Sequence, residues 1–192
     1  CALLFGFFSN AYALNLDKAK VDFLSGDYKS AILEAEKILA NSQEASGLAE
    51  LYYLLGLSYL KEGNYLRASD IFEIILKEYK NNDFTDEARL GLGDTYLLRE
   101  EYGRAEQYYK EIIAADPDTK LKAQIYYRLS QIGFKKGDNL QAKAYLDKLK
   151  ADLPLSLESR LSRDLYPALD SASSFYYTVQ VGSFSKKINA AG

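Results

Sequence analysis

The fold is decided by residues 51–80, which read LYYLLGLSYLKEGNYLRASDIFEIILKEYK. Apolar residues recur at helical spacing on both sides of Glu62-Gly63-Asn64. Gly63 suits the left-handed conformation that ends a helix. The stretch therefore predicts two amphipathic helices, over Ala49–Lys61 and Tyr65–Lys80, joined by a tight turn.

The same pattern returns every 37 residues along the 192-residue chain. Three columns keep this spacing over four copies: Gly26, Gly63, Glu100 and Gly137; Ala31, Ala68, Ala105 and Ala142; Tyr28, Tyr65, Tyr102 and Asn139. A fixed period of this length is typical of stacked-repeat proteins, which work through an extended surface. We expect four helix pairs, over residues 14–48, 49–85, 86–122 and 123–154.

Small residues in the pattern have a packing role. Gly56 and Gly93 are expected where a partner helix approaches closely, and the alanine column occupies the matching point on each second helix. Replacing one of these alanines by a larger residue, as in Ala68→Leu, should overpack the helix pair and lower the free energy of unfolding by roughly 1–3 kcal/mol.

The pattern resembles the tetratricopeptide repeat. The second copy carries the family's residues in order: Tyr52, Leu55-Gly56, Tyr59, Gly63-Asn64-Tyr65, Ala68 and Phe72. The third copy supplies Leu92-Gly93, Tyr96, Tyr102, Ala105, Tyr109 and Pro117. The resemblance covers residues 14–154 and implies an all-α, right-handed superhelix of about four helix pairs. The usual repeat has about 34 residues, and the longer unit is similar to the periplasmic branch, which includes the Tol-Pal coordinator protein and the outer-membrane assembly lipoproteins.

Residues 1–13 favour a secretory signal peptide remnant, because the apolar run CALLFGFF precedes small residues at Ala11 and Ala13. Two alternatives remain open. Cys1 could be the lipidated first residue of a lipoprotein, or the run could form an apolar helix packed on the array. The first two interpretations indicate a periplasmic or cell-envelope location.

The repeat pattern of the sequence ends at Pro154. Residues 155–174 predict a capping helix, with Leu157, Leu161 and Leu165 on one face, followed by a short linker. Residues 175–192 then alternate like a strand. Their string YTVQVGSFS, followed by Asn189-Ala190, resembles the opening of a SPOR domain, a small α+β module that binds peptidoglycan glycan strands. The alternative is a lone edge strand folded onto the array.

The composition gives little support to catalysis. The chain has no His, Met or Trp, and its one cysteine is Cys1. A net charge of −3 argues against a nucleic-acid surface, and no nucleotide or nucleophile motif is present. Asp83, Asp86 and Glu87 lack calcium-loop spacing and suit the first turn of a helix. We therefore expect no enzyme activity, no cofactor and no metal site.

Surfaces are the remaining candidate sites. The tetratricopeptide resemblance implies that each first helix lines a groove for an extended peptide or a partner helix. The matching residues are Tyr53, Leu57, Lys61, Leu90, Asp94, Tyr127, Arg128, Gln131 and Lys135. Alternatively, Tyr53 and Tyr127 pack on neighbouring repeats. The SPOR resemblance assigns glycan contacts to Gln180 and Ser183, whose polar groups suit sugar hydroxyls.

Together these patterns predict a non-enzymatic periplasmic scaffold, acting in the cell envelope or in division. The repeats would bind protein partners, and the SPOR module would bind peptidoglycan. The alternative is an outer-membrane assembly lipoprotein-type adaptor anchored through Cys1.

Overall fold

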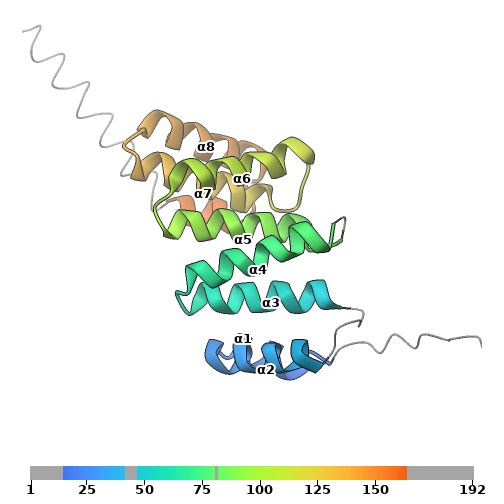
Figure 1. Ribbon diagram of the computed structural model, residues 1–192. Coiled ribbons are helices and arrows are strands. Elements are labelled where there is room, and N and C mark those ends of the chain that lie inside the picture. Colours follow the sequence, from blue (N-terminus) through green and yellow to red (C-terminus); the bar gives the residue numbers. More distant parts are fainter. Residues whose placement is uncertain (1–14, 42–46, 81, 164–192) are drawn as a thin grey trace, which may run out of the picture. The chain divides into compact units, whose positions relative to one another are not determined.

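The computed structural model describes residues 15–41, 47–80 and 82–163, and its regular elements over these ranges are all helices (Figure 1). The eight principal helices are α1 (Asp17–Leu24), α2 (Tyr28–Asn41), α3 (Leu48–Lys61), α4 (Tyr65–Glu78), α5 (Thr85–Leu98), α6 (Tyr102–Ala115), α7 (Lys122–Lys135) and α8 (Asn139–Asp152). A further helix covers residues 157–163. The predicted all-α class is confirmed. The segment predicted to open a SPOR domain lies outside the described residues.

The turn inside each pair has one geometry, built by the repeated glycine column. Gly26, Gly63 and Gly137 all have positive φ, from 75 to 85°. The next amide then reaches back to the helix, as Asn64 N does to the Tyr59 carbonyl at 2.9 Å. The third pair makes the same turn with Glu100 at φ 62°, a conformation that L residues adopt at a cost.

The second helices of the first, second and fourth pairs begin directly after these turns with a capping side chain. Asn64 accepts a hydrogen bond from Arg67 N, and Asp138 accepts one from Gln141 N. Asp27 likewise accepts from Ser30 N at 3.1 Å. A glycine followed by Asp or Asn therefore ends one helix and starts the next within two residues.

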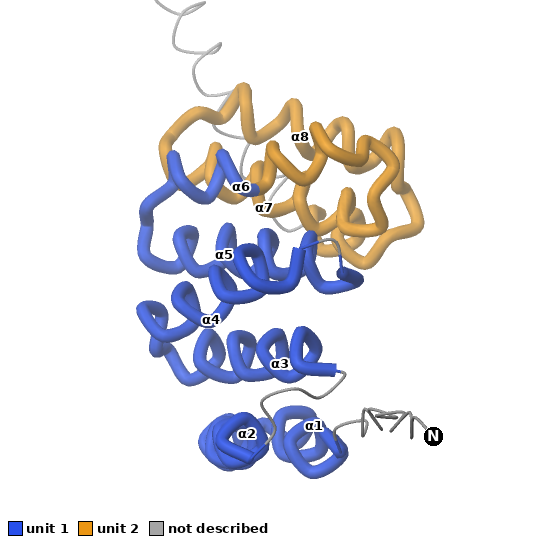
Figure 2. The backbone as a smooth tube through the Cα atoms, turned by 45° about the vertical axis from the view of Figure 1, so that its right-hand side comes forward, with its two compact units in different colours: residues 1–108 blue, residues 109–192 orange. Residues whose placement is uncertain are grey.

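The chain divides into two compact units, Cys1–Tyr108 and Tyr109–Gly192, which we describe separately (Figure 2). The boundary falls within α6. In the first unit α3 contacts α1, α2, α4 and α5. In the second unit α7 packs along α8.

One aromatic ring fills the space between repeats in the first unit. Phe72 on α4 is fully buried. A Cβ added at Gly56 on α3 would lie 2.7 Å from its ring, and one added at Gly91 on α5 would lie 2.5 Å from it. Gly56 therefore permits a close approach, as expected, although its neighbour is this ring. Gly91 was not anticipated from the sequence.

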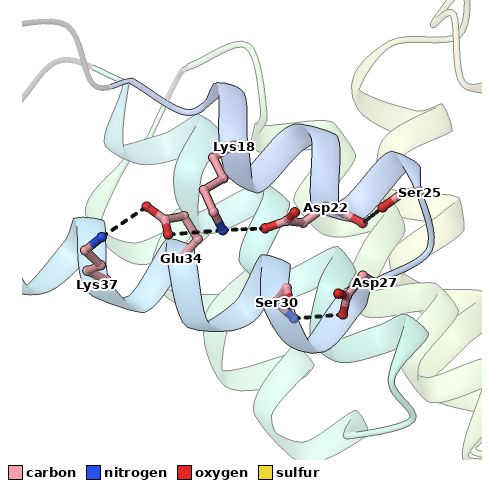
Figure 3. A network of polar contacts seen from close by, with 7 residues as sticks. All are labelled: Lys18, Asp22, Ser25, Asp27, Ser30, Glu34 and Lys37. Carbon is pink, nitrogen blue, oxygen red and sulfur yellow. Dashed lines mark hydrogen bonds and ion pairs between the residues drawn. The ribbon is translucent and has the colours of Figure 1, made fainter.

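The first helix pair carries polar and charged residues at positions where the second pair carries apolar ones. In the second pair, Tyr52, Leu55, Tyr59 and Ile71 pack against the first pair in one apolar cluster. The residues 37 positions earlier are Asn15, Lys18, Asp22 and Glu34. Lys18 Nζ lies 2.9 Å from Asp22 and 3.3 Å from Glu34, which also pairs with Lys37 (Figure 3). A polar outer face is what the terminal repeat of an array requires.

The second unit has its own core, with Leu146 and Leu149 of α8 fully buried. Gly133 on α7 lets the helices meet at Ala142, because an added Cβ would lie 2.8 Å from the Ala142 backbone nitrogen. The predicted orientation of the capping helix is wrong: Leu157 and Leu161 are 56% and 43% exposed, whereas Ser159 and Ser162 are buried. Small serines allow close packing, and Ser162 Oγ donates to the Ser159 carbonyl, so its polar group is satisfied.

Candidate functional site

The first helices α1, α3 and α5 lie side by side in the first unit, because α3 contacts both of the others. Lys20 Nζ on α1 lies 2.6 Å from the Glu50 carboxylate on α3, which ties these helices together on their shared face. The turns that follow the helices are also neighbours. Lys29 bridges to Glu62 at 3.4 Å, and a shallow depression is lined by residues 62–66 together with Arg99.

The predicted residues of α3 lie on this shared face, which we call the first-helix face and define by Lys20, Leu57, Lys61 and Asp94. Leu57 is half-buried and Lys61 is exposed. Tyr53 is also half-buried, and its ring centroid lies 6.2 Å from Phe72 and 5.4 Å from Phe84. Those ring contacts favour the alternative in which Tyr53 packs on its neighbours.

On α5 the two predicted residues differ in accessibility. Asp94 is half-buried, whereas Leu90 is 7% exposed and belongs to the core. The face also includes two residues that were not predicted from the sequence, Leu24 at 82% and Leu98 at 52% exposure. They stand 37 residues before and after Lys61. The repeat period could therefore have identified them.

In the second unit the predicted residues lie along one side of α7. Tyr127, Arg128 and Gln131 are half-buried, and Lys135 is exposed at the last helical position. Tyr127 packs against the buried cluster of α7 and α8, as Tyr53 packs in the first unit. The two tyrosines thus contribute to packing, while the polar side chains remain accessible.

Comparison with protein families confirms the resemblance to the tetratricopeptide repeat. A sequence model of the tetratricopeptide repeat matches residues 53–119, and a second one matches residues 123–150. The chain is a tetratricopeptide repeat (TPR) protein. No curated protein sequence matches the TPR protein.

Solved structures share the fold of the TPR protein. A tetratricopeptide repeat protein from Parabacteroides merdae gives a TM-score of 0.63 at 15% identity, over 82% of this chain and 59% of that one. BtubC (BKLC) from P. vanneervenii gives a TM-score of 0.59 at 22% identity, over 69% of this chain and 58% of that one. Pseudomonas aeruginosa pilF gives a TM-score of 0.56 at 20% identity, over 76% of this chain and 63% of that one. The chain spans about three fifths of the length of these structures.

Some of the perturbed titratable groups of the TPR protein lie in contacts between its helices. Burial and a hydrogen bond to the Glu36 carboxylate raise the pKa of Tyr59 to about 12. This bond joins α3 to α2. Burial likewise raises the pKa of Tyr79. The Arg104 guanidinium lies 3.8 Å from the Tyr96 ring centroid and hydrogen-bonds Glu101, which raises the pKa of Arg104.

Groups that could hold a metal ion are absent from the described parts of the TPR protein. Within the same ranges, the helices are too short or too polar to span a bilayer. Asp86 and Glu87 occupy the first turn of α5, where Asp86 pairs with Arg89 at 2.6 Å. Cys1, Gln180 and Ser183 lie outside the described residues.

Proposed function

We propose that this TPR protein is a non-enzymatic scaffold that binds protein partners along its first-helix face. TPR repeats bind proteins, and arrays work through extended surfaces. The observation that carries the proposal is the accessibility of Leu57 and Lys61 between α1 and α5. Their side chains stand on a face shared by three helices. An extended peptide crossing these helices would contact each repeat in turn.

A photo-crosslinking amino acid at position 57 tests this proposal in cells that express the full-length protein. The matched control places the same group at position 33, because Leu33 is 67% exposed on α2, a second helix. We expect discrete protein adducts from position 57 and none from position 33. Equal adducts from both positions, or none from position 57, would contradict binding on the first-helix face.

We also propose that the scaffold acts in the periplasm, in the cell envelope or at division sites. Two sequence features support this location: the apolar run ending in Ala11-Tyr12-Ala13, and the SPOR-like string at residues 177–185. Gln180 and Ser183 would then contact glycan strands. The test is co-sedimentation of the full-length protein with sacculi whose stem peptides an amidase has removed. Equal binding to untreated sacculi would contradict the glycan assignment.

A further inference from the structure

Three side chains follow one another across the C-terminal ends of the first helices. They are Leu24 on α1, Lys61 on α3 and Leu98 on α5, at intervals of 37 residues. Each stands four residues after a member of the first-helix face, namely Lys20, Leu57 or Asp94. Residues four apart share one side of a helix. The three side chains therefore form the edge of that face, at the positions where the helices end.

The two leucines are unusually accessible for their type. Leu24 is 82% and Leu98 is 52% exposed, and both flank the helix that carries Lys61. Single exposed leucines are common. Here two of them occupy one repeat column, on α1 and α5, and the half-buried Leu57 lies one turn before Lys61 on the helix between them.

The charge of Lys61 is not neutralised by the described residues. Lys61 makes no ion pair within the ranges that the structure describes. Nearby cations do: Lys20 pairs with Glu50, and Lys29 pairs with Glu62. Arg99, in the turn after α5, pairs with Glu101 at 2.7 Å. Within the described residues the amino group of Lys61 is thus left without an acidic partner, and it is available to a bound carboxylate.

We propose that this edge binds an extended segment of a partner protein that carries an apolar, an acidic and an apolar residue at intervals of three. The proposal rests on the proposed function and names its ligand. Packed helices lie about 8–10 Å apart, and an extended chain in the polyproline II conformation advances about 3.1 Å per residue with three residues per turn, so that every third side chain points to the same side. Every third residue of the ligand therefore meets the next helix. Leu24 and Leu98 receive the apolar side chains, and Lys61 receives the carboxylate.

Fluorescence anisotropy with three labelled peptides tests the proposal on the full chain. The peptides share Leu-Ser-Ser-X-Ser-Ser-Leu and carry Glu, Ser or Lys at X. We expect the Glu peptide to bind most tightly and the Lys peptide most weakly. In Lys61→Glu this order should reverse, with the ratio of the two Kd values changing by about tenfold or more. Lys80→Glu, the same charge change on an exposed residue beyond α4, should leave the order unchanged.

The leucines are tested in the same assay. Leu24→Ser and Leu98→Ser should each weaken the Glu peptide about threefold or more, whereas Leu33→Ser on α2 should not. Circular dichroism checks that each variant is folded. If the Lys peptide binds wild type best, the partial negative charges of the three helix ends outweigh Lys61, and the proposal is overturned. Absence of binding by all three peptides overturns it as well, while adducts from position 57 would still uphold the proposed function.

Discussion

Replacing Gly91 by alanine should destabilise the first unit, because the new methyl group would collide with a trapped ring. The added Cβ would lie 2.5 Å from Cζ of Phe72 and 2.7 Å from both Cε atoms. The optimal separation of two non-bonded carbon atoms is about 3.5–4.0 Å. The ring cannot move aside, since it is fully buried and a Cβ at Gly56 on the opposite helix would also lie only 2.7 Å from it.

The magnitude follows from two opposing effects. Overpacking a core by one methyl group costs roughly 1–3 kcal/mol. Alanine is a better helix former than glycine by about 1 kcal/mol, which offsets part of that cost. Because Phe72 is held from both sides, we expect the upper part of the range and a net loss of about 2 kcal/mol. Gly103→Ala on α6 is the matched control, since an added Cβ there meets nothing within 4 Å.

Urea unfolding followed by far-ultraviolet circular dichroism measures both variants. Gly103→Ala should be as stable as wild type or more stable, and Gly91→Ala clearly less stable. A double-mutant cycle identifies the cause: in a Phe72→Leu background, Gly91→Ala should become nearly neutral, with a coupling free energy of about 2 kcal/mol. If Gly91→Ala loses the same free energy in both backgrounds, the collision with Phe72 is not the reason.

Three further predictions concern the turns, a buried phenol and the charged face. Glu100→Gly should raise the free energy of unfolding by about 0.5–1 kcal/mol in urea melts, because it removes a left-handed L residue, whereas Gly63→Ala should lower it. The folded-state pKa of Tyr59, about 12, exceeds the ordinary value of 10.0, so its stabilising contribution is complete below pH 10 and lost as pH rises towards 12. Between these values wild type should lose stability faster than Tyr59→Phe, and parallel urea midpoints would contradict this. Sedimentation velocity should show more self-association than wild type in a triple variant that restores the apolar residues of the later pairs: Lys18→Leu, Asp22→Tyr and Glu34→Ile.

The helices were predictable because their apolar residues keep a fixed period. The predicted helix over residues 49–61 differs from α3 by one residue, and the turn at Gly63 has the expected conformation. Gly91 was not predictable in the same way. The residues 37 positions before and after it are Leu54 and Arg128, so its column does not repeat. Its role depends on the ring of one residue, Phe72, reaching across from α4.

The candidate site was predictable where a position in the repeat fixes exposure. Lys61 and Lys135 are exposed at the last turn of their helices, as their shared column suggests. Leu24 and Leu98 occupy that column too, but leucine in an amphipathic helix ordinarily indicates core. Leu90 shows the opposite problem. Its column holds half-buried tyrosines in two other repeats, yet a smaller side chain at this position is covered by its neighbours.

Recognition of a partner must depend on columns that vary while they remain exposed. The alanine column is identical in all four pairs, and each of its members, Ala31, Ala68, Ala105 and Ala142, is fully buried. A buried residue that is the same everywhere cannot distinguish one ligand from another. The column of Lys61 instead presents Leu, Lys, Leu and Lys in successive pairs, on side chains that the fold does not need for packing. Exchanging Lys61 and Leu98 should therefore leave stability nearly unchanged and move the preferred acidic residue along the bound peptide by three positions. Anisotropy with peptides of both registers would detect that shift, and an unchanged register would show that selectivity lies elsewhere.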